Sequence, residues 1–297
     1  MDFQYPSRSR IMDERTALTL IGSWLPAAGD DAAVVDDLVL STDMLHETTD
    51  FPDGTTRYTA GWRAVGASLS DIAAMGADAT AAVAVYAAPS FEEDELETFI
   101  DGARAVCEQS GAEYVGGDLD GHDEFTVTTT VVGETTTPVR RSGATPGETL
   151  CVTGTLGRSG AALELFDCDP ERANDIFQFD PRVAAGRTIA PHAGAMIDSS
   201  DGLARSLHQL AEASDCGFKV VGDALPIDKR VHEVATDELS VYELSVHFGE
   251  DFELVFTTDA IETVRAVSPV PVTPIGTVTD EGVSLDGEAL PDRGYSH

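Results

Sequence analysis

An early stretch of the chain gathers carboxylates and hydroxyls around two short apolar runs. The runs predict two strands, and Asp36-Asp37 between them predicts a two-residue hairpin turn, because Asp tolerates positive φ better than most residues. Pairing outward from that turn places Asp31 opposite Thr42. Oxygen-only ligand sets of this kind suit Mg²⁺ or Ca²⁺. Two interpretations stay open: a cation site at the open end of the hairpin, or a solvated acidic end.

Further carboxylates lie where other predicted elements end. Asp71 falls near the C-terminal end of a predicted helix, where the macrodipole disfavours an anion by roughly 0.3–1 kcal/mol. A bound metal would offset this unfavourable interaction, and the apolar neighbours of Asp71 favour the interpretation as a metal ligand. Asp118 follows Gly116-Gly117 after a strand. It is either part of a common Gly-Gly-Asp turn or a metal-binding carboxylate where the backbone closely approaches a ligand.

Asp198 and Asp201 flank a predicted strand-to-helix junction that also holds two serines. The ordinary interpretation is an N-cap. The functional interpretation is a helix N-terminus that binds a phosphate oxygen while the aspartates hold its metal. The glycine-rich segment 154–160 lacks the lysine of a phosphate-binding loop, so it favours a tight turn. Glu250 precedes another strand and is either a turn residue or a substrate contact.

The charge of the chain is extreme, with 53 acidic and 18 basic residues and a formal net charge of -35. We interpret it as a surface adapted to high internal salt, because salt screens self-repulsion; the alternative is a protein that binds basic partners. No basic patch supports a nucleic-acid partner. Because the net field repels a polyphosphate, metal ions would have to supply positive charge, which favours phosphoryl transfer assisted by several Mg²⁺ ions.

Length, cysteines and termini predict a two-domain cytoplasmic protein. The chain has 297 residues and four cysteines without a C-x-x-C pair, which we interpret as reduced core thiols. The N-terminus lacks a signal-peptide pattern. No apolar run approaches the ~20 residues of a membrane helix, and the histidines lack the spacing of a zinc hydrolase.

The order of predicted elements indicates an α/β (α+β) fold. Apolar residues from Tyr58 to Ile72 recur at steps of four and three, as on one face of a helix, with small residues between them and Gly76 placed to end it. The turn-rich stretch 140–147 predicts a boundary between an N-terminal α/β domain, residues 1–140, and a C-terminal α/β domain, residues 141–297.

An ordered series of motifs resembles the thiamine-monophosphate kinase family over nearly the whole chain. The motifs are G-D-D-A at 29–32, S-T-D at 41–43, L-S-D-I-A-A-M-G-A at 69–77, G-G-D at 116–118, R-S-G-A-T-P-G at 141–147, V-T-G-T-L-G at 152–157, I-D-S-S-D-G-L at 197–203, G-E-D-F-E-L at 249–254 and I-G at 275–276. The wider superfamily of ATP-using enzymes includes aminoimidazole ribonucleotide synthetase and selenophosphate synthetase.

The resemblance implies direct transfer of the ATP γ-phosphoryl group to thiamine monophosphate, giving thiamine diphosphate and ADP. It implies a homodimer whose N-terminal mixed sheets join, with ATP between the domains. By position, the implied metal ligands are Asp31, Ser41, Thr42, Asp43, Asp71, Asp118, Asp198 and Asp201, of which Asp43, Asp71, Asp118 and Asp198 are expected to be most critical. The implied ATP contacts are Gly117, Asp118, Arg141 and Ser200, and Glu250 is an implied substrate contact.

Two positions depart from the family pattern. Asp50 stands where the family often has a substrate-contacting His, and Asp292 stands where it often has a Trp. An Asp attracts a cationic thiazolium but cannot stack on it as Trp does, so Tyr295 is a candidate for the aromatic face. These departures keep a second hypothesis open, an enzyme of the same superfamily with another acceptor. A third is a non-catalytic acidic binding protein.

Overall fold

The structure is a computed structural model that describes residues 14–25 and 27–294. The helices are α1 (Glu14–Trp24), α2 (Glu47–Asp50), α3 (Arg57–Ala74), α4 (Glu93–Ser110), α5 (Arg158–Leu165), α6 (Pro170–Phe177), α7 (Val183–Ile189), α8 (Leu203–Ser214), α9 (Val231–Val234), α10 (Glu238–Tyr242) and α11 (Ile261–Val267), with single turns η1 (Ala190–His192), η2 (Gly222–Ala224) and η3 (Glu243–His247). The strands are β1 (Ala33–Val35), β2 (Leu38–His46), β3 (Asp78–Ala88), β4 (Glu113–Gly121), β5 (Thr126–Glu134), β6 (Thr149–Thr153), β7 (Met196–Asp198), β8 (Gly217–Val220), β9 (Leu254–Thr258), β10 (Val272–Thr279), β11 (Val283–Leu285) and β12 (Glu288–Ala289).

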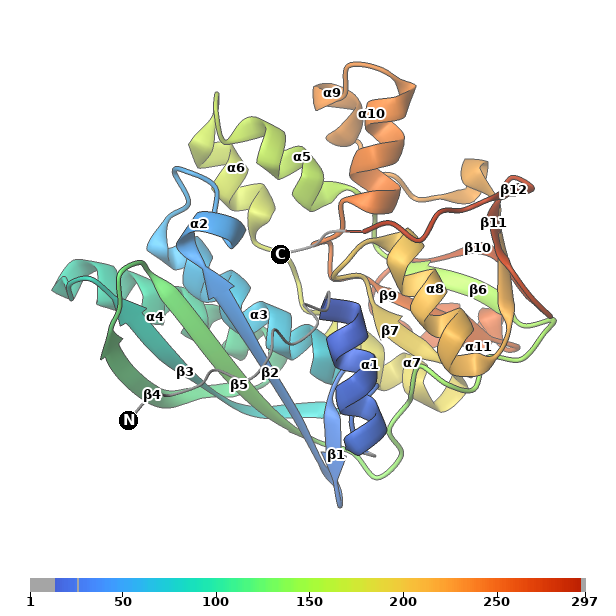
Figure 1. The fold of residues 1–297 in the computed structure, drawn as a ribbon, viewed down its shortest axis with the longest axis horizontal. Coiled ribbons are helices and arrows are strands. Elements are labelled where there is room, and N and C mark those ends of the chain that lie inside the picture. The colour runs from blue at the N-terminus through green and yellow to red at the C-terminus, as the bar shows by residue number, and fades with distance from the viewer. Residues whose placement is uncertain (1–13, 26, 295–297) are drawn as a thin grey trace, which may run out of the picture.

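Two mixed sheets confirm the predicted α/β class (Figure 1). The first has the order β1-β2-β5-β3-β4, and the second has the order β12-β11-β8-β10-β6-β9-β7. Strands before residue 135 form the first sheet and strands after residue 148 form the second. The predicted boundary at residue 140 lies in the segment between them.

The hairpin predicted at the start of the first sheet is present. Val35 pairs with Leu38, and Asp36 at the turn has a φ of 55°. The ladder ends where Ala33 pairs with Leu40, so β1 never reaches Asp31. The predicted pairing of Asp31 with Thr42 is therefore wrong, and Asp31 is free to turn toward other elements.

Helix α3 lies at the centre of the molecule and packs on both halves (Figure 1). It contacts β2 and β5 of the first sheet and β7 of the second. Gly61 on α3 and Gly102 on α4 meet at the crossing of the two helices, where an added Cβ would collide with the facing backbone, as the small residues of this segment predicted. Gly76 follows the C-cap of α3 with a φ of 66° and ends the helix.

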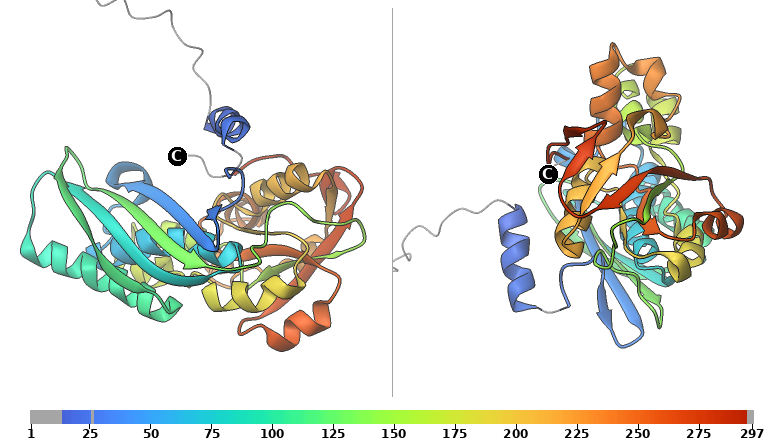
Figure 2. Two further views of the ribbon diagram at one scale, coloured as in Figure 1. Left: turned by 90° about the horizontal axis from the view of Figure 1, so that it is seen from below. Right: turned by 90° about the vertical axis from the view of Figure 1, so that its right-hand side faces the viewer.

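In the described part of the chain, helices pack on one face of the first sheet. Residues of α3 and α4 share a core with alternate residues of β2, β3 and β5, and both helices lie on one side of the sheet (Figure 2). On the opposite face Met44, Val83 and Val85 are exposed. Within the described residues β4 has no partner along its outer edge, and β2 pairs with β1 only over Leu38–Leu40. Over the described residues, the sheet therefore has an exposed face that carries apolar side chains, and two open edges.

The second sheet is covered on both faces. Apolar residues of α8 pack with one face of its strands, whereas α7 and α11 pack on the other. Cys107, Cys151 and Cys216 are buried as predicted, but Cys168 is exposed, so the prediction of four core thiols is wrong for Cys168. Within the part of the chain that is described, no helix has the length and apolar character needed to span a membrane.

Candidate active site

Three carboxylates from distant parts of the sequence meet where the two halves join. Ligand oxygens of Asp31, Asp71 and Asp198 all lie within 4.8 Å of one another. Asp31 precedes β1, Asp71 lies in the last turn of α3, and Asp198 ends β7. An all-oxygen set of this kind fits a hard divalent cation such as Mg²⁺.

Neighbouring hydroxyls and a guanidinium fix these carboxylates. Ser41 donates a 2.5 Å hydrogen bond to Asp71, and Ser70 donates one of 2.6 Å to Asp198. Arg141 donates to both oxygens of Asp31, at 3.0 and 3.3 Å. Because the Asp31 side chain is fully buried, Arg141 is the counter-ion that compensates its charge.

Crowding of the carboxylates alters their ionisation. Burial, followed by the charges of Asp198 and Asp31, raises the pKa of Asp71 well above its ordinary value. Burial and the charge of Asp31 raise the pKa of Asp198 to about 7. Burial alone would lower the pKa of Arg141, but the Asp31 carboxylate raises it overall. The site is thus short of positive charge, which a divalent cation would supply.

A hollow of about 290 Å³ opens beside the carboxylate cluster. We call it the central hollow; it is lined by Thr42, Asp43, Leu45, Arg63, Ala67, Asp71, Arg141, Ser200, Asp201, Glu250 and Phe252. Seven of the residues proposed from the sequence are in this lining. Asp31, Ser41 and Asp198 lie next to Asp71 of this lining, so the site combines carboxylates and hydroxyls with two arginines.

Four of the remaining proposed residues do not line the central hollow. Gly117 and Asp118 are on the edge strand β4, and Asp118 is exposed. Asp50 accepts hydrogen bonds from His46 N–H at 2.7 Å and the Thr49 hydroxyl at 2.8 Å. Asp292 pairs with Arg205 at 3.2 Å. Tyr295 lies outside the described residues.

The glycine-rich segment 154–160 forms a turn whose amides bind a carboxylate of the protein itself. Gly157 N–H and Ser159 N–H donate to Asp251, at 2.5 and 3.0 Å. These amides precede and begin α5, so Asp251 occupies the place that a phosphate would take in a phosphate-binding loop. The structure therefore favours the tight turn over the phosphate cradle.

Sequence reasoning missed Arg63 and Ser70, both on α3. Fourteen of the eighteen residues of α3 are buried, so a charged or hydroxyl side chain on it must have a partner. The sequence signal that could have indicated this burial was the alternation of small and apolar residues around the whole helix. Of the two interpretations of the Asp198–Asp201 junction, the N-cap is excluded, because Gly202 is the N-cap of α8 and no side chain caps it.

We predict that Mg²⁺ stabilises the protein more at pH 8 than at pH 5. The raised pKa values of Asp71 and Asp198 mean that the metal-free fold holds extra protons between about pH 4 and 7, so its stability falls as pH rises through that window. Metal binding needs the ionised carboxylates. Melting temperatures with and without Mg²⁺, at constant high KCl, should differ more at pH 8. An equal Mg²⁺ shift at both pH values would contradict the assignment.

Known proteins are similar to this chain, some over its N-terminal part and some over nearly its whole length. Residues 29–135 match the family model described as AIR synthase related protein, N-terminal domain. The chain is 60% identical over 291 residues to the thiamine-monophosphate kinase of Halobacterium salinarum, covering 96% of this chain and 100% of that one. It is 40% identical over 301 residues to the enzyme of the same name from Methanospirillum hungatei, covering 96% and 99%. The chain belongs to the thiamine-monophosphate kinase family.

A solved structure has the same architecture. The structure of AaThiL complexed with AMPPCP and TMP matches with a TM-score of 0.89 and 28% sequence identity, covering 98% of this chain and 100% of that chain. The similarity extends over both sheets, so the family assignment and the fold agree. The predicted salt-adapted surface is consistent with a 60% identical relative from Halobacterium.

Proposed function

We propose that this chain phosphorylates thiamine monophosphate with ATP. In this reaction a phosphate oxygen of thiamine monophosphate forms a bond to the γ-phosphorus of ATP, in line with the breaking bond to the β,γ-bridging oxygen. ADP leaves with that oxygen, and thiamine diphosphate is the other product. The single observation that carries the proposal is the meeting of Asp31, Asp71 and Asp198 beside the central hollow. The names of the relatives and the AMPPCP and TMP in the matched structure support the choice of substrates.

Several Mg²⁺ ions are part of the proposal. Asp31, Asp71 and Asp198 are the carboxylates best placed to hold them, with Ser41, Thr42, Asp43 and Asp201 beside them. Bound Mg²⁺ would neutralise phosphate charge and polarise the transferring group. The chain's own residues orient the reactants: Arg141, which lines the central hollow, presents a guanidinium suited to a phosphate. Ser200 lines the same hollow and is another of the proposed ATP contacts.

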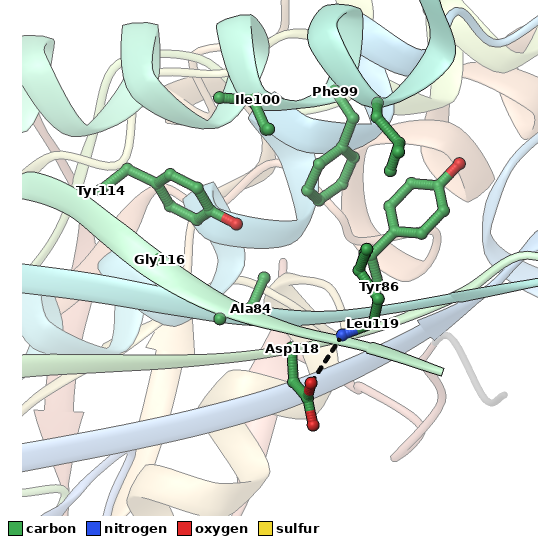
Figure 3. Close-up of a pocket in the computed structure, with 10 residues that line it drawn as sticks. Ala84, Tyr86, Phe99, Ile100, Tyr114, Gly116, Asp118 and Leu119 are labelled. Atoms are coloured by element: carbon green, nitrogen blue, oxygen red, sulfur yellow. Dashed lines mark hydrogen bonds between the residues drawn. The ribbon is translucent and has the colours of Figure 1, made fainter. Parts of the chain in front are cut away.

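A second hollow supports a site for the base of ATP. It has a volume of about 390 Å³ and lies between α4 and the strands β3 and β4. Figure 3 shows Tyr86, Phe99 and Tyr114 around it, with the Asp118 carboxylate on the other side of the sheet. Aromatic and apolar walls of this kind suit a flat heterocycle. The proposed ATP contacts Gly117 and Asp118 belong to its lining.

The homodimer is proposed from the open edges and exposed face of the first sheet. Asp43, Thr129, Ala84 and Gly117 lie in one cross-strand row, so Gly117 is about 14 Å from Asp43 within one chain. Pairing of the β4 edge with the free edge of β2 in a second copy would bring Asp118 close to the partner subunit's Asp43. Open edges are templates for such pairing. We therefore propose that Asp118 completes the site of the partner subunit.

Asp118→Asn is predicted to lower turnover about 10²-fold or more, with little loss of stability, because Asp118 is exposed. Mixing Asp118→Asn with Asp71→Asn subunits tests whether Asp118 acts in the active site of the partner subunit. Hybrid dimers would keep one intact site, so an equimolar mixture after subunit exchange should recover about a quarter of wild-type activity. A mixture of confirmed hybrid dimers that stays inactive would contradict the arrangement. A melting temperature that falls together with activity would contradict the ligand role.

The reaction is tested by measuring ADP formation in high-KCl buffer with ATP and Mg²⁺. Turnover should require both Mg²⁺ and thiamine monophosphate, and the product should be thiamine diphosphate. No turnover with active-site residues intact and nucleotide bound would contradict the proposal. A panel with an aminoimidazole ribonucleotide precursor and with selenide tests the alternative acceptors. Nucleotide binding that is unchanged by Asp43→Asn or Asp71→Asn, without turnover, would favour a non-catalytic binding protein.

The cytoplasmic location stays a prediction.

A further inference from the structure

Arg63 is a buried cation at one end of the central hollow. Arg63, Ala67 and Asp71 follow one another at four-residue steps on α3, so they share the face that lines the hollow. The Arg63 side chain is only 2% exposed. The Arg63 side chain therefore lies inside the protein, between Asp71 at the predicted metal end of the hollow and the lining residues of the C-terminal half.

Three aromatic rings and two acceptors fix the Arg63 guanidinium. Its central carbon lies 3.5 Å from the Phe177 ring centroid, 5.2 Å from that of Phe179 and 5.7 Å from that of Phe252. It donates a 2.6 Å hydrogen bond to the Phe177 carbonyl oxygen and another to the Glu250 carboxylate. A planar guanidinium held in this way has one orientation, which a lysine ammonium would not reproduce.

Glu250 is the more exposed member of this ion pair. Its side chain is 15% exposed, against 2% for Arg63, and it lines the central hollow. The backbone at Glu250 has a φ of 59°, and its N–H donates a 2.6 Å hydrogen bond to the Ser200 carbonyl oxygen. A left-handed glutamate is strained, and the contacts on both its backbone and its carboxylate hold it in place.

We propose that Arg63 is a positioning residue that holds the Glu250 carboxylate as a hydrogen-bond acceptor for an N–H donor of the acceptor substrate. The inference rests on the proposed function, in which that donor is the exocyclic amine of the thiamine pyrimidine. The adjacent Phe252 ring supplies an apolar wall for a flat heterocycle. Arg63 and Glu250 then select the substrate, while Arg141 and the carboxylate cluster serve the phosphates.

The test measures separate KM values for thiamine monophosphate and for ATP in Arg63→Lys, Glu250→Gln and the double variant. Each single variant should raise KM for thiamine monophosphate about tenfold, the value of one hydrogen bond to a charged group. KM for ATP should stay within about twofold. Because both changes disable the same substrate contact, KM for thiamine monophosphate in the double variant should be no higher than in the poorer single variant. Arg57→Lys is the matched control, since Arg57 is also on α3, pairs with two glutamates and lies over an aromatic ring.

A substrate analogue gives a second readout. Thiamine monophosphate with the exocyclic amine replaced by an oxo group should be a poorer substrate than thiamine monophosphate for the wild type, and Glu250→Gln and Arg63→Lys should reduce that preference. Additive effects in the double variant would show that Arg63 acts separately, for example on a phosphate, and would overturn the proposal. Equal increases in both KM values would overturn it as well. A wild type without thiamine-monophosphate-dependent turnover would instead refute the proposed function.

Discussion

Asp71→Asn is expected to lower kcat about 10³-fold, because a lost metal ligand removes several kcal/mol of charge stabilisation. The same change should leave the metal-free protein as stable as the wild type or more stable at pH 8, since it removes one of three mutually repelling carboxylates. Steady-state turnover and melting temperatures in EDTA, both in high KCl, measure the two effects.

Asp175→Asn is the matched control for that experiment. Asp175 is exposed on α6, so its replacement removes the same charge without touching the cluster. It should retain wild-type turnover and the wild-type response to Mg²⁺. Asp71→Asn with nearly normal turnover, or with an unchanged Mg²⁺-induced rise in melting temperature, would show that Asp71 holds no metal.

Arg141→Met is expected to damage both activity and stability. It leaves the fully buried Asp31 carboxylate without its counter-ion, which should cost about 3–5 kcal/mol in the metal-free protein. It also removes the guanidinium proposed to bind ATP, so kcat/KM for ATP should fall about 10²-fold. Urea denaturation in EDTA and steady-state kinetics measure the two losses.

Two companion variants sharpen the Arg141 result. Arg140→Met removes a neighbouring arginine whose partner is Asp30 and whose side chain is 46% exposed, so its stability loss should not exceed about 1 kcal/mol. Arg141→Lys keeps the charge and should lose less stability than Arg141→Met. A Met variant as stable as the wild type in EDTA would mean that Asp31 does not depend on Arg141.

Turns and helix ends could be predicted from the sequence because they depend mainly on the conformational preferences of neighbouring residues. Asp36 forms the predicted turn, and Gly76 ends α3 where expected. The strand predicted after Glu250 begins only at Leu254, because Phe252 has a φ of 54° and cannot join a ladder. The four-residue strand β8 was not predicted, since its Lys219 interrupts an already short apolar pattern.

The candidate site was harder to predict because long-range packing assembles it. The sequence pointed to Asp31, Asp71 and Asp198 separately, and only the contact of α3 with both sheets brings them together. The same packing leaves Asp118 on an edge strand away from them. Arg63 was missed because a lone arginine beside apolar residues is typical of an exposed helix position, whereas the partners that bury it, Phe177 and Glu250, are more than a hundred residues away.

The most direct test is a crystal structure with AMPPCP, Mg²⁺ and thiamine monophosphate bound. We predict metal density ligated by oxygens of Asp31, Asp71 and Asp198, with the triphosphate in the central hollow. Metal and triphosphate bound elsewhere, with these three side chains free of any cation, would contradict the account.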